Sequence, residues 1–295
     1  MAFTARSVQQ TIWAARWKAY LDTKTVWASL CNRYYEGDAD GANSVNIQGL
    51  ANHTIQTYFG TGSLVRSYVS SSQTTLNLNQ EMYDSFLIPK VVEITTNTDI
   101  INGELERSTV AFANTVDDYV AGLSSSLSHT NQIYSQSAVP VTIGTKAQYE
   151  AGTATVTGSA YRIGAQLAEQ VFRNNVPKDG RAFLVVPEWF VRLLAGDFNT
   201  NFTDINANGL VDGARVAGLQ VYTSNNIQGG GYGTDDHIIA GHPDYWTFAG
   251  GLKDFHMFPA TDEIGTQVNV IYKYGAVMTN ASAFAFARVA KYSLA

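Results

Sequence analysis

The sequence predicts an α+β fold, and three observations support this class. Apolar residues recur with helical period over 104–127. Apolar and polar residues alternate as in strands, first between 45 and 80 and again over 237–286. A helical pattern over 161–175 stops at a turn and is followed by a short apolar run of strand length. At 32.1 kDa the chain can bury a sizeable core, in one large domain or two ordinary ones.

The first 24 residues predict a helix that packs on other parts of a protein. Trp13, Trp17 and Leu21 recur at helical spacing and form one apolar stripe. Four basic residues against one acid also fit an organelle transit peptide. Large aromatic residues are unusual in a disposable leader, so we favour a structural arm.

The region between 44 and 80 predicts a long β-hairpin. Strand-like alternation covers Val45 and Ile47, then 54–59, then 75–80. Residues 60–72 have loop composition at both ends and an apolar middle. An isolated two-stranded hairpin is marginal in water, so this one needs a surface to lie on, either of its own subunit or of a neighbour.

The helical period of the apolar residues over 104–127 predicts a helix that is about 35 Å long, at a rise of roughly 1.5 Å per residue. Asp117 and Asp118 fall opposite its apolar positions and are expected to face solvent. Asn102 is a candidate N-cap, and a start as early as Asp99 remains open.

The middle of the chain predicts a helix, a turn and a strand. Pro177 ends the helix over 161–175, because proline lacks an amide hydrogen and favours an extended predecessor. Asp179 and Gly180 make the turn, and 183–186 forms the strand.

Four further segments have simple predictions. Residues 128–157 are predicted to be mostly loop, and residues 189–195 a short helix. Residues 229–236 are predicted to form a mobile surface loop, and residues 237–286 β structure. Within the last segment, Val268, Val270 and Tyr272 are expected to share one face of a strand.

Composition limits the function. The net charge of -6 and the charged fraction of 15% argue against a protein that wraps nucleic acid, so any contact with DNA should be weak and non-specific. Cys31 is the only cysteine, which rules out an intrachain disulfide and a multi-cysteine zinc site. There is no apolar run of transmembrane length, so no membrane partner is expected.

No residue pattern predicts catalysis, a cofactor or a metal. The five histidines lack metal-ligand spacing and are expected mostly at surfaces or turns. No Gly-x-Ser-x-Gly elbow or phosphate loop occurs, and the glycines of 229–233 lack the dinucleotide pattern. Residues 204–212 match part of a calcium loop, but Arg215 stands where a bidentate glutamate belongs. We therefore expect an Asx-rich turn there and a protein that is not an enzyme.

Two stretches resemble the major capsid (coat) proteins of tailed bacteriophages. One runs Phe172-Arg-Asn-Asn-Val-Pro-Lys-Asp-Gly-Arg181 and continues as Ala-Phe-Leu-Val-Val-Pro187; the other is Gly218-Leu-Gln-Val-Tyr-Thr-Ser-Asn-Asn226. The resemblance implies the Hong Kong 97-like capsid fold, with an N-terminal arm, an extended β-hairpin loop, a long spine helix and a mixed α/β body.

The resemblance also implies an organisation along the chain. The expected parts are an N-terminal arm (1–43), the extended loop (44–90), a peripheral domain with the spine helix (91–134), an axial domain (135–249) and a return to the peripheral domain (250–295).

By the same resemblance the chain is expected to be a structural protein of the virion. It would self-assemble into the icosahedral head shell that encloses the phage double-stranded DNA, through hexamers and pentamers. Some members of the family join a loop lysine to a neighbour's asparagine, but no lysine lies between Lys24 and Lys90, so a noncovalent shell is expected. The candidate inter-subunit contacts are Trp13, Trp17, Leu21, Tyr58, Phe59, Leu64, Val65 and Tyr68.

The implied partners are further copies of the chain, a separate scaffolding protein, a portal and decoration proteins. A separate scaffold is expected because the sequence begins at the arm. The implied location is the virion capsid, with the host cytoplasm during assembly.

Two other functions stay open at this point. An encapsulin-like nanocompartment uses the same fold without a viral genome. A β-rich glycan-binding or fibre protein is favoured by the Gly, Asn, Ser and Tyr content, but disfavoured by the long helix and the Asn-Val-Pro turn.

Overall fold

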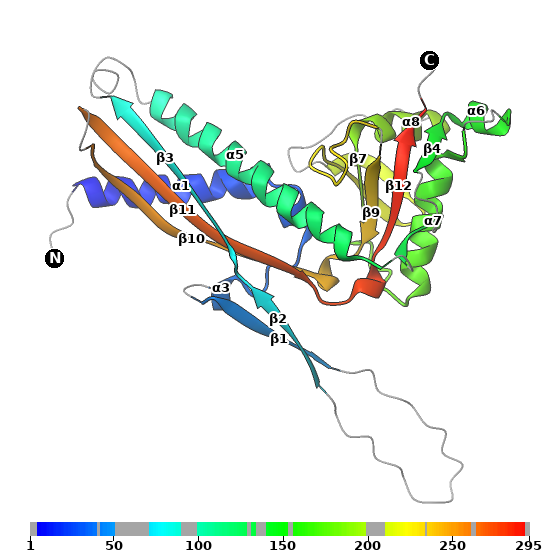
Figure 1. The fold of residues 1–295 in the computed structure, drawn as a ribbon, viewed down its shortest axis with the longest axis horizontal. Helices are drawn as coiled ribbons and strands as arrows, with labels where there is room; N and C mark the ends of the chain where they lie inside the picture. Colours follow the sequence, from blue (N-terminus) through cyan, green and yellow to red (C-terminus); the bar gives the residue numbers. More distant parts are fainter. Residues whose placement is uncertain are drawn as a thin grey trace, which may run out of the picture.

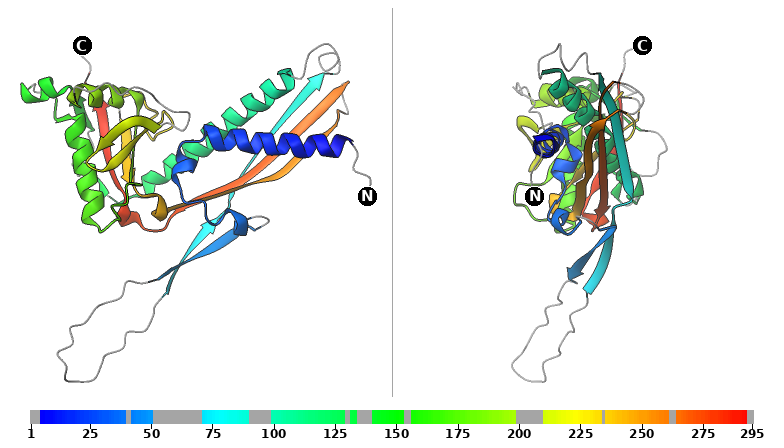
Figure 2. Two further views of the ribbon diagram at one scale, coloured as in Figure 1. Left: turned by 180° about the vertical axis from the view of Figure 1, so that it is seen from behind. Right: turned by 90° about the vertical axis from the view of Figure 1, so that its left-hand side faces the viewer.

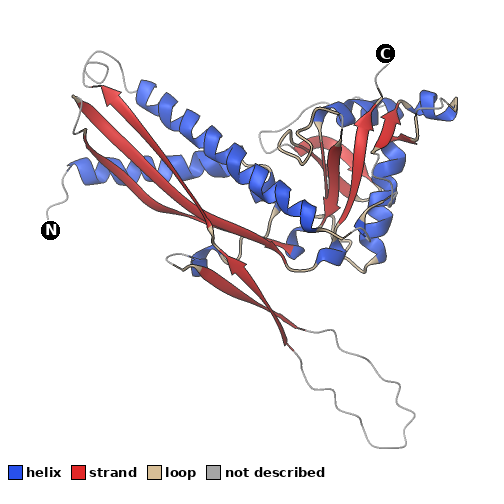
Figure 3. Cartoon of the chain, viewed as in Figure 1, coloured by secondary structure: helices blue, strands red, loops and turns tan. Residues whose placement is uncertain are grey.

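The computed structural model describes residues 5–39, 42–50, 71–89, 99–128, 131–133, 140–152, 156–198, 210–233, 235–260 and 264–292. These residues form a body around one sheet, an elongated part around a second sheet, and a two-stranded hairpin that extends away from both (Figures 1 and 3). The predicted α+β class is confirmed. None of the helices in these ranges is long and apolar enough to cross a membrane.

The body is built on a mixed sheet of seven strands in the order β5-β4-β12-β9-β6-β8-β7. In chain order the strands are β4 (Val141–Gly144), β5 (Gly158–Ser159), β6 (Phe183–Val186), β7 (Leu210–Val216), β8 (Leu219–Thr223), β9 (Asp236–Gly241) and β12 (Ala285–Lys291). Helix α7 (Ala160–Arg173) packs against β12, β9 and the second body helix, α8 (Glu188–Phe198). All four side chains of β6 are buried, so this strand lies at the centre of the body core.

Local chemistry explains where α7 begins and ends. The Ser159 side chain accepts the N–H of Arg162 and caps the first turn. After Arg173 the backbone of Asn175 has a φ of 58°, a left-handed conformation that stops the helix just before Pro177. The predicted helix, turn and strand are thus confirmed, and α8 extends beyond the 189–195 expected from the sequence.

The elongated part rests on an antiparallel sheet in the order β10-β11-β3. Its strands are β3 (Gln80–Pro89), β10 (Trp246–Pro259) and β11 (Gly265–Met278). Two long helices, α1 (Ala5–Lys24) and α5 (Asp99–Gly122), cover one face of this sheet, as Figure 2 shows. On that face Tyr272 of β11 contacts the rings of both Trp17 and Phe112. Val268, Val270 and Tyr272 are buried together, as predicted.

The hairpin pairs β1 (Ser44–Leu50) with β2 (Ser71–Asn77), in antiparallel register from Ser44 opposite Asn77 to Leu50 opposite Ser71. A small separate cluster lies at its base. Its buried members are Val45, Ile47, Leu76, Leu78 and Ala249. The hairpin therefore has a small separate cluster at its base, where it touches β10, β11 and α3.

Short elements connect these parts. They are the α-helices α2 (Trp27–Leu30), α3 (Glu36–Ala39) and α6 (Lys146–Glu150), and the 3-10 turns η1 (Leu123–Ser126), η3 (Pro243–Tyr245) and η4 (Ala281–Ala283). Helix α6 and strand β4 lie within 128–157, which the sequence analysis assigned mostly to loop.

The structure corrects two predicted boundaries. The segment 44–90 is not all extended loop, because β3 leaves the hairpin at residue 80 and pairs with β11. The segment 250–295 does not return to the elongated part as a whole, since β12 joins the body sheet between β4 and β9. Non-local strand pairing, which alternation along the sequence does not specify, decides both cases.

The start of the long helix is also settled. It begins at Asp99, so Asn102 lies inside the helix and is not its N-cap. Asn102 instead accepts a bond from Arg16 of α1, with Nη1 and Oδ1 3.5 Å apart.

Candidate assembly surfaces and the joint that positions them

The arm helix α1 buries its apolar stripe within its own subunit. Trp17 is fully buried and meets Phe112 of α5 edge to face, with ring centroids 5.1 Å apart. Leu21 is buried in the same cluster, and Trp13 is half-buried against it. The predicted helix is therefore confirmed. The contact role between subunits expected for Trp17 and Leu21 stays a prediction, and it would require these buried side chains to leave the core of their own subunit.

The five hairpin candidates, Tyr58, Phe59, Leu64, Val65 and Tyr68, lie outside the described residues. So does the predicted strand over 54–59. Their role in contacts between subunits stays a prediction.

A buried carboxylate fixes the corner where the arm turns from α1 into α2. Asp117 of α5 accepts three backbone N–H groups: Val26 at 2.8 Å, Trp27 at 3.0 Å and Ala28 at 3.3 Å. It was expected to face solvent but is only 2% exposed, whereas Asp118 next to it is exposed as predicted. Burial raises the pKa of Asp117 to about 7, although the three N–H donors act in the opposite direction.

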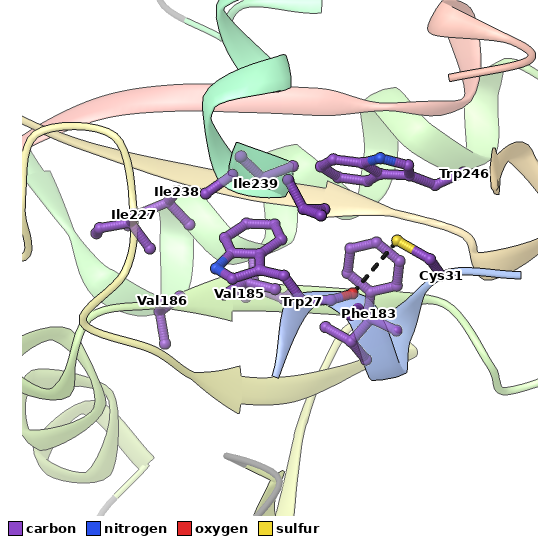
Figure 4. Packing of buried hydrophobic residues seen from close by; sticks show 14 of the residues in the cluster. Trp27, Cys31, Phe183, Val185, Val186, Ile227, Ile238, Ile239 and Trp246 are labelled. Carbon is purple, nitrogen blue, oxygen red and sulfur yellow. Dashed lines mark hydrogen bonds between the residues drawn. The ribbon is translucent and has the colours of Figure 1, made fainter. Parts of the chain in front are cut away.

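The arm corner also inserts into the body core. In Figure 4 the Trp27 indole lies among side chains of β6 and β9, and its ring centroid is 5.6 Å from that of Trp246. Its Nε1 donates to the backbone oxygen of Asn226 at 2.6 Å. The Cys31 thiol donates to the backbone oxygen of Trp27, shown by the dashed line in Figure 4. Burial, and then the nearby Asp117, raise the pKa of Cys31, so this thiol stays neutral.

The segment that follows β8 bridges the body to other parts of the chain, and the predicted surface loop over 229–236 carries the exposed Tyr232. Asn226 Nδ2 donates to Asn114 of α5 at 3.1 Å, and Ser124 of η1 donates to Gln228 at 3.2 Å. On the body side, the buried Asp236 accepts the backbone N–H of Gly233 at 2.7 Å. Residues 224–233 thus connect the body to the long helix and the arm corner, a group of contacts that we call the joint.

A second set of polar contacts links the two sheets. Arg181 forms a two-pronged ion pair with Asp244, at 2.8 and 2.7 Å, and a third bond to Asp179 at 2.6 Å. His242 Nδ1 accepts the N–H of Asp244, so Nε2 is the nitrogen that donates to Asp179, at 3.0 Å. The backbone N–H of Arg181 and the His242 ring lower the pKa of Asp179. His242 caps the 3-10 turn η3, one of the places expected for the histidines, and its side chain is fully buried there.

This cluster joins the turn before β6 to η3, the segment through which the chain passes from β9 of the body to β10 of the elongated part. Within the described ranges, Asp179, His242 and Asp244 are the one group of potential metal ligands close enough to share an ion. Both carboxylates already bind the Arg181 guanidinium, so the arrangement is that of an ion-pair network. The predicted calcium-like stretch begins outside the described residues, and Arg215 lies exposed on β7.

Two surfaces of the elongated part are open. A groove of about 210 Å³ lies between β3 and α5, lined by Met82, Tyr83, Asp84, Ala111, Phe112 and Thr115. The sheet face opposite the helices carries Tyr83, which is 78% exposed and pairs across the strands with Ile271. Next to it Ser85, Asn269 and Gln267 form a hydrogen-bonded polar row. Sequence alternation predicted β11 but not β3, and it did not predict which face of the sheet the helices would cover.

Comparison with known proteins gives matches by structure. No protein-family model matches the chain, and a search of curated proteins finds no relative. A chain from a structure of Mycobacterium phage Che8 is 20% identical, with 89% of this chain and 90% of that chain covered, at a TM-score of 0.62. A chain from the capsid of cyanophage P-SCSP1u is 15% identical, with 86% and 84% covered, at 0.57.

A virus-like particle from Pyrococcus furiosus has the same arrangement. Its chain is 9% identical, with 94% of this chain and 98% of that chain covered, at a TM-score of 0.53. At these identities the comparisons show the fold, which is that of phage capsid chains over both the body and the elongated part. The narrower Hong Kong 97-like designation remains a prediction from the sequence.

Proposed function

We propose that this chain is the major capsid protein of a tailed phage, a subunit of the shell that encloses the double-stranded genome. One observation carries the proposal: the fold matches over 89% of this chain with a chain from Mycobacterium phage Che8, and over 86% with one from the capsid of cyanophage P-SCSP1u. No chemistry competes with it, since the strongest polar cluster in the described residues is an internal ion-pair network.

The geometry of the hairpin supports a role in assembly. Strands β1 and β2 extend from the elongated part and pair only with each other within the described residues (Figure 1). A two-stranded ribbon with a small core gains stability by lying on another surface. A neighbouring subunit in a closed shell provides one, and the many repeated contacts of a shell make weak contacts sufficient.

The arm has a different role in this proposal. Because Trp17 and Leu21 are buried in their own subunit, α1 braces the elongated sheet from within. Contacts between subunits then fall to the hairpin and to the open surfaces around Tyr83. Hexamers and pentamers would form through these contacts without covalent links, since residues 25–89 contain no lysine.

Negative-stain electron microscopy of the purified protein tests the proposal directly. Closed polyhedral shells are the expected result. Single particles at high concentration, or trimeric rods typical of a fibre protein, would contradict it. A separate scaffolding protein, a portal and decoration proteins are further proposed partners, and co-expression of neighbouring genes would show whether shells need them.

An encapsulin-like compartment is the second candidate, favoured by the likeness to the Pyrococcus furiosus particle. The two differ in contents. Shells isolated from the native source should protect double-stranded DNA from nuclease if they are phage heads. Shells that protect a cargo protein and no DNA would support the compartment instead.

A further inference from the structure

The elongated sheet has two edge strands, β10 and β3, and other parts of the chain bind to β10. Asn32 forms a bridge with Thr247 of β10, and Gln10 of α1 donates from Nε2 to the backbone oxygen of Met257 at 3.1 Å. The pairing of β10 with β11 also contains a register shift. Contacts and irregularities of this kind hinder the addition of another strand, so the β10 edge is protected.

The β3 edge lacks these features within the described residues. All ten residues from Gln80 to Pro89 pair with β11 in one unbroken register. No backbone group of another described element bonds to this strand. Its one proline is the last residue, and it carries no lysine or arginine. The outer side of β3 therefore presents N–H and C=O groups to which an extended chain can bind.

The groove between β3 and α5 runs beside this edge. Phe112 in its lining is held by Trp17, edge to face at 5.1 Å, and Thr115 donates its hydroxyl to the backbone oxygen of Ala111 at 3.0 Å. The groove holds about 210 Å³, which is less than the roughly 300–1,000 Å³ of ordinary small-molecule sites. It therefore suits a single apolar side chain better than a whole small molecule.

The edge and the groove lie where one added strand can use both. Successive side chains of a strand point to opposite faces, so Met82 and Asp84 of β3 lie on the helix side and line the groove. A strand bound alongside β3 would place every second side chain on the same side. Main-chain bonds to a sheet edge, combined with a pocket for alternate side chains, are a general mode of peptide recognition.

Two carboxylates beside the groove favour a basic partner. Asp84 lines the groove, and Asp118, three residues after Thr115, lies on the same side of α5. Neither carboxylate has an ion pair among the described residues. The basic residues that flank this region in β10 and α5 already have acidic partners, in the pairs Lys253–Glu81 and Arg107–Glu104. Pairing of two copies through β3 would bring Asp84 side chains of like charge to one edge, which disfavours a second copy as the occupant.

We propose that the β3 edge and the groove form a docking site for an extended segment of a separate protein. The segment adds a strand along β3 and inserts an aliphatic side chain of about leucine size between Met82 and Thr115. A lysine or arginine two residues away lies near Asp84 or Asp118. The site belongs to the folded subunit, so it stands or fails independently of whether the chain forms shells.

A synthetic peptide tests the proposal. The probe is Thr-Arg-Thr-Leu-Thr-Arg-Thr, acetylated and amidated, which places arginine two residues from leucine in either strand direction. It is titrated into the isotope-labelled, unassembled full chain, and binding is followed by NMR and by amide hydrogen exchange. We expect saturable binding and slower exchange of the amides in 80–89 that face away from β11. Absence of binding, or protection confined to other strands, would overturn the proposal.

Matched variants locate the leucine pocket. Ala111→Phe should fill the groove and abolish binding of the probe. Val110→Phe, the same change one residue earlier at a position that is also exposed, should retain it. Equal affinity of the two variants would contradict insertion into the groove.

Charge reversal tests the basic partner. Asp84→Lys should weaken binding of the probe by about fivefold, as expected for a partly exposed ion pair. A probe with glutamate in place of both arginines should bind this variant more tightly than it binds the unmodified chain. An unchanged order of affinities would contradict the charge argument.

Modified probes test main-chain pairing. Of two probes that are N-methylated at alternating residues, one should lose binding, because only every second N–H of a strand faces its neighbour. Retained binding by both would contradict strand addition. If the outward amides of β3 are protected without any probe, and lose that protection when residues 60–70 are deleted, the hairpin of a second copy occupies the edge and the proposal of a separate partner is wrong.

Discussion

The arm helix α1 and the β1–β2 hairpin both carry apolar residues at regular spacing, yet they are held in different ways. The arm places Trp17 and Leu21 in the main core, where α5 and β11 surround them. The hairpin buries four residues, Val45, Ile47, Leu76 and Leu78, in a small cluster with Ala249 of β10 at its base. An apolar stripe thus indicates that a segment will be buried, but not whether its own subunit or a neighbour buries it.

The largest expected effect is on the arm. Trp17→Ala should lower the free energy of unfolding by about 3 to 5 kcal/mol, because it removes a fully buried indole between Phe112 and Tyr272. Denaturant titration of the unassembled subunit measures this. Tyr34→Ala, at a ring that is 81% exposed, should change it by less than about 0.5 kcal/mol. A stable Trp17→Ala subunit that fails to assemble would restore the arm as an interface element.

A smaller effect is expected where the hairpin is attached. A Cβ at Gly275 of β11 would lie 2.1 Å from the backbone oxygen of Asn77, so Gly275→Ala must push β2 away from the sheet. We expect a loss of about 1 to 3 kcal/mol and faster hydrogen exchange in 71–78. Gly251→Ala is the control, because its Cβ would meet nothing within 4 Å. Equal behaviour of the two variants would mean that the hairpin is not seated on β11.

The smallest effect on the subunit is expected from deleting residues 60–70, which stops short of the first residue of β2. The deletion should change the unfolding free energy by less than about 1 kcal/mol, since longer or shorter surface loops alter closure entropy only slowly. Circular dichroism should be unchanged, and electron microscopy should show no shells. Normal shells from the deleted chain would remove the hairpin tip from the assembly contacts.

Much of the fold followed from local sequence signals. Pro177 and Asn175 end α7, and 183–186 forms the buried strand expected of an apolar run. Such features depend on neighbours a few residues apart, which the sequence displays directly.

The missed features depend on segments that are far apart in the chain. Asp117 was assigned to solvent by helical period, but the N–H groups that satisfy it come from residues about ninety positions earlier. His242 lies at a turn, as the sequence allowed, but its burial and its contact with Asp179, 63 positions earlier, were not predicted. The placement of β12 in the body sheet is likewise a matter of pairing, not of composition.

The position of β12 has a consequence for synthesis in the cell. This strand follows every other strand of the body in the sequence, yet it lies between β4 and β9 and pairs with both. Until residues 285–291 have left the ribosome, β4 and β9 have open edges facing each other and the body sheet is split in two. We therefore expect a chain that ends before residue 285 to lack the strand that joins the two halves, which would leave the body sheet of an incomplete product open.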